Sequence, residues 1–168
     1  MRKFRIGVYS LRVFMVIAIG LMAFSVNCPA EQFKFADWVG IEETDSATNI
    51  KSRQIGTVAK DGSSTLWLTD LDAGGDNIEL TLKSSEKIAS VYFSYRIDSV
   101  DTLVIRSAIK GCESHCLKDS IPKKGELLKT MKRGLRMQFE YDSYPDIAQK
   151  PMFSLRGFSK AYWWLLSK

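Results

Sequence analysis

Hydrophobic and polar residues alternate with a period of two in three segments of the chain, a pattern typical of β-strands with one buried face. The segments span residues 78–82, 89–97 and 135–141, and the side chains expected in the core are Ile78, Leu80, Leu82, Ala89, Val91, Phe93, Tyr95, Ile97, Leu135, Met137, Phe139 and Tyr141. Five less regular segments are also predicted strands, at 35–41, 55–59, 66–69, 103–109 and 152–155. About eight short strands at this spacing predict a mainly β fold, an antiparallel β-sandwich or barrel-like domain.

Two segments follow a helical period instead. Residues 124–133 place Leu127, Leu128 and Met131 on one face and cations in the last turn, with Gly134 as the stop, which predicts a short amphipathic helix. A second apolar stripe at i, i+3, i+4, i+7 and i+8 consists of Phe158, Ala161, Tyr162, Leu165 and Leu166. This spacing predicts a C-terminal helix over 158–166 that packs on the sheet, with Gly157 at its start.

The first thirty residues have the layout of a secretory signal peptide. Four basic residues and no acid precede and flank an apolar run over 13–24, and a small residue stands at Ala30. This run is shorter than the ~20 residues that span a bilayer. We therefore expect cleavage after Ala30 and an exported, soluble protein, periplasmic or secreted, with one domain over 31–168. Lipid attachment at Cys28 is disfavoured because Asn27 stands where a small residue is preferred.

The charge of the chain comes largely from this leader. The full sequence carries a net charge of +5 from 24 basic and 19 acidic residues, and the leader holds four of the basic ones. The segment after residue 30 is therefore close to neutral. Its charge gives no argument for a nucleic-acid partner.

Cleavage would leave two cysteines, Cys112 and Cys116, with the only histidine, His115, between them. An even cysteine count in an oxidising compartment favours a Cys112–Cys116 disulfide. The three side chains are also conceivable metal ligands, but a structural zinc site normally has four. We expect neither a metal nor another cofactor.

One run of the chain is strongly basic. Residues 118–136 contain seven cations against two acids, and such a run either attracts anions or forms a solvated helix face. The candidate binding residues are Lys123, Lys124, Lys129, Lys132 and Arg133. Trp163 and Trp164 lie off the apolar stripe of the last helix, so they either cover the sheet edge or present an aromatic anchor to a partner.

Three motifs in order suggest a family. They are Gly111-Cys112-Glu-Ser-His-Cys116, then Leu127-Leu128-Lys-Thr-Met-Lys-Arg-Gly134, and finally Phe153-Ser-Leu-Arg-Gly-Phe-Ser-Lys-Ala161. Over residues 103–166 the chain resembles the invasion-associated locus B family of small exported bacterial proteins. The family commonly has a further cysteine pair near an opening tryptophan. This chain has Trp38 there but no cysteine between residues 31 and 111.

The resemblance implies an envelope or secreted protein with a role in host interaction and virulence, and it carries no catalytic residues. The sequence itself contains no nucleophile elbow, phosphate-binding loop or metalloprotease motif. We therefore expect a binding protein that is not an enzyme, with an unknown protein or an anionic envelope surface as its partner. The alternative is a small periplasmic enzyme or enzyme inhibitor that uses His115 and loop carboxylates, for which the paired acids Glu42, Glu43, Asp70 and Asp72 are candidates.

Overall fold

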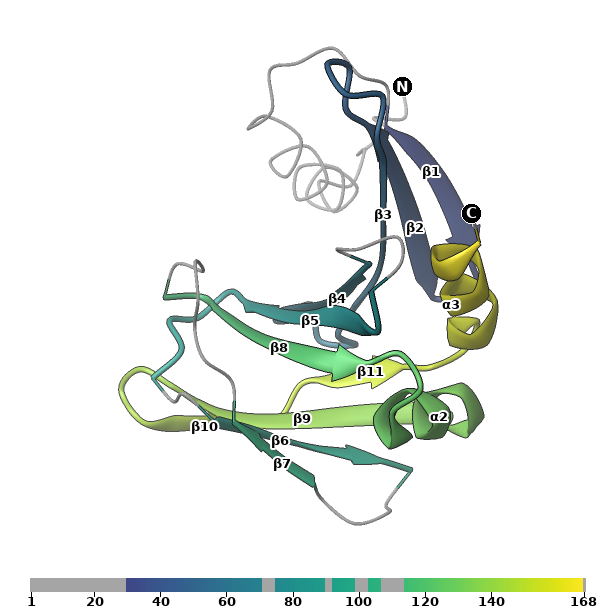
Figure 1. Ribbon diagram of the computed structural model, residues 1–168. Helices are drawn as coiled ribbons and strands as arrows, with labels where there is room; N and C mark the ends of the chain where they lie inside the picture. The colour runs from purple at the N-terminus through teal and green to yellow at the C-terminus, as the bar shows by residue number, and fades with distance from the viewer. Residues whose placement is uncertain (1–29, 71–74, 90–91, 99–102, 107–113, 168) are drawn as a thin grey trace, which may run out of the picture.

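In a computed structural model, the described residues are 30–70, 75–89, 92–98, 103–106 (backbone only) and 114–167 (Figure 1). The strands are β1 (Glu31–Phe35), β2 (Trp38–Thr44), β3 (Lys51–Val58), β4 (Ser64–Thr69), β5 (Asn77–Ser84), β6 (Tyr92–Ile97), β7 (Leu103–Arg106), β8 (Cys116–Pro122), β9 (Arg136–Ser143), β10 (Ile147–Gln149) and β11 (Met152–Ser154). The helices are α2 (Glu126–Arg133) and α3 (Phe158–Leu166).

The strands form two antiparallel sheets. One has the order β1-β2-β3-β4-β5-β8, and the other has the order β10-β9-β6-β7, with β11 also paired to β9. The sheets face one another at the β4-β5-β8 end of the first, and α3 lies beside its β1-β2 end (Figure 1). The predicted mainly β, sandwich-like fold with two helices is confirmed, and the sandwich is not a closed barrel.

The core lies between the sheets and under the helices. Alternation is the cause, because every second side chain of a strand points to the same side of its sheet. The side of the six-stranded sheet that faces the core, here called its inner face, carries Ile55, Leu66, Leu68, Ile78, Leu80 and Leu82, all fully buried. The opposite side is called the outer face. The second sheet contributes Phe93, Tyr95, Ile97, Met137, Phe139 and Tyr141.

These buried residues confirm the strand phases predicted for β5, β6 and β9, with two exceptions. Ala89 was expected in the core but is exposed and precedes β6, and Val91 lies outside the described residues. Leu135 was expected in the core but is 68% exposed. Strand β9 begins one residue later, at Arg136, and the Leu135 backbone N–H donates instead to the Asp98 carboxylate at 2.7 Å. The period-two pattern in the sequence therefore starts one residue before the strand does.

Both predicted helices are present. Helix α2 begins at Glu126 rather than residue 124, buries Leu127, Leu128 and Met131, and ends before Gly134. Helix α3 follows Gly157, whose φ of 86° lies in the left-handed region. A Cβ at this position would also collide with the carbonyl oxygen of Phe35, so both backbone conformation and space require glycine here.

One strand prediction needs correction, and two strands were missed. The segment 35–41 is the end of β1, a turn and the start of β2, with Ala36 at a φ of 55°. Strands β8 and β10 were not predicted. Strand β8 overlaps the start of the basic run, and its polar residues made it look like a loop. Among the described residues it pairs with β5 alone, at the end of the sheet. Residues 107–109 of the predicted strand 103–109 lie outside the described residues.

Candidate functional site

The basic helix and the C-terminal helix meet at Lys132. Its Nζ atom lies 4.1 Å from the centroid of the Tyr162 ring and 5.2 Å from that of Trp163. The carbonyl of Lys132 accepts a hydrogen bond from Ser159 Oγ at 3.0 Å, which fastens the end of α2 to the start of α3. A cation placed over aromatic rings is attracted by their quadrupoles. The fold therefore brings together one member of each set of predicted binding residues, Lys132 and Trp163.

The five predicted cations differ in environment. Lys124, Lys129 and Arg133 are exposed, and Lys129 lies 3.7 Å from Glu126 in a solvent-exposed i,i+3 ion pair. Lys123 is half-buried and its Nζ lies 2.8 Å from a carboxylate oxygen of Asp70. The Lys123 carbonyl also accepts from the Tyr162 hydroxyl at 2.8 Å. Lys123 thus holds loop and helix together, while the other cations face solvent or the rings.

The two adjacent tryptophans point in different directions. Trp163 is 66% exposed, next to Lys132. Trp164 is half-buried over the inner face of the six-stranded sheet, with its ring centroid 4.8 Å from that of Phe33 and 5.7 Å from that of Phe35. The interpretation as a cover of the sheet edge therefore describes Trp164, and a role of Trp163 as an anchor for a partner stays a prediction. Trp164 covers the sheet end, and Trp163 is an exposed aromatic group.

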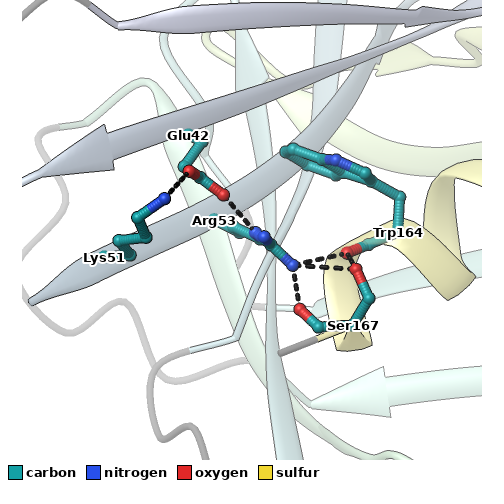
Figure 2. Close-up of polar contacts among 5 residues, drawn as sticks. All are labelled: Glu42, Lys51, Arg53, Trp164 and Ser167. Carbon is teal, nitrogen blue, oxygen red and sulfur yellow. Dashed lines mark hydrogen bonds and ion pairs between the residues drawn. The ribbon is translucent and has the colours of Figure 1, made fainter.

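A cluster of charged groups fastens the end of α3 to the sheet (Figure 2). The Arg53 guanidinium donates to the Trp164 carbonyl at 3.2 Å, to Ser167 Oγ at 2.8 Å and to the Ser167 carbonyl. It also donates to Glu42 at 2.5 Å, and its Cζ lies 5.1 Å from the centroid of the Trp164 ring. Arginine supplies several donors in one plane, which suits the carbonyls left unpaired at a helix end.

Glu42 completes this cluster from β2. Its other carboxylate oxygen accepts from Lys51 Nζ at 2.7 Å. The hydrogen bonds from Lys51 and Arg53 hold the pKa of the Glu42 carboxyl below its usual value. Glu42 was considered as a loop carboxylate, but it lies within a strand and both its oxygens are engaged by cations.

The carboxyl group of Asp119 has its pKa shifted in the opposite direction, upward. Asp119 lies in β8, directly opposite Leu80 in the strand register. Partial burial raises the pKa of Asp119. Burial, followed by the charge of Asp119, raises the pKa of Tyr95 to about 12. The Asp119 carboxylate and the Tyr95 hydroxyl therefore share the inner side of the sheet, where the charged form of each is disfavoured.

The cysteine-bearing turn is described in part. Cys116 opens β8 and is buried, and His115 is exposed. Cys112 lies outside the described residues, so its pairing with Cys116 stays a prediction. No group of three or more metal-binding side chains occurs among the residues that the structure describes.

Of the residues considered for an alternative enzymatic site, His115 lines a hollow on the outer face together with Glu79 and Lys118. Glu79 accepts from Lys118 Nζ at 2.7 Å. Asp70 is paired with Lys123, and Asp72 lies outside the described residues. The hollow that His115 lines thus contains Glu79 but none of Glu42, Glu43 and Asp70.

Sequence reasoning missed Trp67, which lines two hollows on the outer face. The signal was available, because Trp67 stands between Leu66 and Leu68 in a strand. Period-two alternation then places its ring on the side opposite the core. Within the described residues no helix is long and apolar enough to cross a membrane.

Comparison with known proteins identified a structural neighbour. The fold is similar to the crystal structure of invasion associated protein B from Bartonella henselae, with a TM-score of 0.63 and 15% sequence identity over 81% of this chain and 96% of that chain. The matched share is larger than residues 103–166, so the similarity of fold extends into the N-terminal half. No known protein family matches the sequence, and no curated protein matches it.

Proposed function

We propose that this chain is an exported binding protein of the cell envelope that acts without catalysis, through the surface where α2 meets α3. The observation that carries the proposal is the position of Lys132 over Tyr162 and beside the exposed ring of Trp163. We call this the α2–α3 surface and define it by Lys124, Lys129, Lys132, Arg133 and Trp163. The similarity of fold to invasion associated protein B supports the same class of role.

The chemistry of this surface favours anionic lipid headgroups as its partner. Tryptophan is preferred where one side of a ring is apolar and its N–H meets water, as at a membrane interface. Each Lys or Arg near an anionic lipid surface contributes ~1 kcal/mol to binding. Lys160 lies one helical turn before Trp163 and is also exposed, which adds a cation to the same side of α3.

Export is part of this proposal. The leader over residues 1–30 is expected to be removed, so the mature protein should begin at Glu31 and occur in a periplasmic or extracellular fraction. A Cys112–Cys116 disulfide fits that compartment. Recovery of protein with its Met1 terminus intact, or with lipid on Cys28, would contradict this part of the proposal.

The binding surface is tested with the triple variant Lys124→Gln, Lys129→Gln, Arg133→Gln. Loss of three exposed cations should weaken binding to vesicles of phosphatidylglycerol mixed with phosphatidylcholine on the order of a hundredfold at low salt, and less as salt rises. Sedimentation of the protein with vesicles measures this binding.

A matched control changes the same number of charges elsewhere, with Lys34→Gln, Lys87→Gln and Lys150→Gln, all at exposed positions. This control should retain most of the affinity, and Trp163→Ala should lose part of it. Equal losses in the two triple variants would mean that only net charge matters. Wild-type binding in the first triple variant would refute the α2–α3 surface, and retention on an acidic protein but not on vesicles would replace the lipid as partner.

A further inference from the structure

The outer face of the six-stranded sheet carries an aromatic ring at its centre. The strand register places Val39, Gly56, Trp67, Thr81 and Lys118 in one row across five neighbouring strands. Their side chains point to the face opposite the core, because Ile55, Leu66 and Leu80 next to them point inward. Trp67 is therefore the large aromatic group of a row that is otherwise small, polar or aliphatic.

The Trp67 ring lies flat on the sheet. Three adjoining ring atoms, Cδ2, Cε3 and Cζ3, all come within 2.6 Å of the place that a Cβ at Gly56 would occupy, at nearly equal distances. An edge-on ring would bring one atom much closer than its neighbours, so the ring presents its face to Gly56. Glycine permits this close approach in a strand interior. The other face of the ring consequently points away from the sheet.

Hollows adjoin this ring on two sides. The first has a volume of about 490 Å³ and lies over β4, β5 and β8. The second has a volume of about 540 Å³ and lies over β2 and β3 next to the segment that follows β11. Because Trp67 lines both, an elongated ligand can occupy the two hollows only by passing over the ring.

The first hollow is rich in groups that form hydrogen bonds. Gln54, Thr69, Thr81 and Ser84 contribute amide and hydroxyl groups. The carboxylate of Glu79 is held by Lys118 at 2.7 Å and by the Thr81 hydroxyl at 3.3 Å. Such groups, fixed in place around an aromatic face, match a ring that has C–H bonds on its flat side and hydroxyls at its rim.

Each hollow also has an excess of one positive charge when His115 is counted as neutral. In the first, Lys83 and Lys118 stand against Glu79. In the second, Lys60 and Arg156 stand against Asp37. A ligand that spans both hollows therefore meets cations on both sides of Trp67, which favours a ligand with repeated negative charge.

From these observations we propose that the outer face binds an acidic oligosaccharide. One sugar ring stacks on the exposed face of Trp67, and the carboxylates of the neighbouring sugars meet Lys83 on one side and Lys60 with Arg156 on the other. This site lies on the side of the sheet opposite α3 and does not depend on the proposed α2–α3 surface.

The experiment compares two ligands with the same sugar chain, one charged and one with its carboxylates neutralised as esters. Tetragalacturonate carries a carboxylate on each ring, and its methyl ester does not. Isothermal titration of the full chain should show binding of tetragalacturonate and at least about tenfold weaker binding of the ester. Trp67→Ala should weaken tetragalacturonate binding about tenfold, the worth of one good aromatic contact.

Because Trp67 also covers Gly56, the alanine variant risks partial unfolding, and a second variant keeps the test decisive. Lys60→Gln with Lys83→Gln changes two exposed side chains and should weaken tetragalacturonate binding without altering the melting temperature. Lys87→Gln with Lys150→Gln is the matched control and should bind like the wild type. Failure to bind tetragalacturonate would overturn the proposal. A second result would also overturn it: hexaglutamate binds as tightly as tetragalacturonate, and a folded Trp67→Ala variant keeps this hexaglutamate binding. The site would then recognise an acidic peptide by charge alone.

Discussion

On each face of the six-stranded sheet a tryptophan ring lies over a glycine, but the two tryptophans have different surroundings. On the inner face the Trp164 ring lies over Gly40, with atoms 2.7 and 2.9 Å from the place of a Cβ there. On the outer face Trp67 lies over Gly56. Trp164 belongs to a helix held by Arg53, whereas Trp67 is bordered by hollows. A tryptophan over a glycine therefore belongs to the core where it comes from a packed helix, and it lines open hollows where no described element packs on it.

The strongest test of this division compares a buried inner residue with an exposed outer one. Phe158 is fully buried, with its ring 4.9 Å from that of Trp38. Phe158→Ala should lower the free energy of unfolding by about 3–5 kcal/mol, because it removes core packing and leaves a cavity. Val58 is 58% exposed on the outer face, and Val58→Thr should change stability by no more than about 0.5 kcal/mol. Urea denaturation of both variants measures the difference, and comparable losses would mean that the faces are not specialised.

The second test separates the neighbouring tryptophans. Trp164→Ala should cost about 2 kcal/mol of folding free energy, since the ring is half-buried against Phe33 and Phe35. Trp163→Ala should stay within about 0.5 kcal/mol, because most of that side chain faces solvent. Thermal unfolding followed by circular dichroism gives both values. A larger loss for Trp163 than for Trp164 would contradict the assignment of the two rings.

The third test concerns the ion cluster at the end of α3 and has the smallest expected effect. The Glu42 pKa is lower in the folded chain than its usual value of 4.5, so the folded state binds fewer protons than the unfolded one as pH falls. The stabilisation is present above pH ~4.5 and is lost as the pH falls through the folded pKa.

Glu42→Gln should accordingly lower the melting temperature at neutral pH, and the difference from wild type should shrink under acid conditions. Glu43→Gln, one residue along the same strand, is the matched control, because the Glu43 side chain is exposed and alternation places it on the outer face. A difference between Glu42→Gln and wild type that persists at low pH would assign the effect to packing rather than charge.

Sequence patterns predicted the parts of the fold where each strand has one apolar and one polar face. Strands β5, β6 and β9 alternate in this way, and Gly157 marks a change of backbone direction that few other residues tolerate. In these segments the apolar residues of the sequence pattern are the ones that the folded protein buries. The short helices were predicted for the same reason, because their apolar stripes face the sheets.

The parts of the fold and of the candidate sites that were not predicted depend on contacts between residues that are distant in sequence. Strand β8 has Lys118, Asp119 and Ser120 in succession, which suggests a charged loop until its pairing with β5 is known. The β1–β2 turn contains Ala36 and Asp37 without a glycine to mark it. At the candidate sites, Lys132 meets Trp163 through packing of two helices, and Trp67 meets Gly56 through strand register. No local pattern specifies either contact.

The contacts around Trp38 have a consequence for the order in which the molecule is assembled. Its indole N–H donates to the Ser154 carbonyl across a sequence separation of 116 residues, and Ser154 Oγ donates to Asp37 across 117. The chain is synthesised from its N-terminus, so the β1–β2 hairpin is made long before β11 and α3. Until those elements are made, Trp38 lacks the residues that cover it. Contacts between such distant segments slow folding because a long loop must close first. The opening strands can pair with β3 early, but their contacts to β11 form only after the last part of the chain is made, and a chain that stops before residue 154 lacks the partner of Trp38 and Asp37.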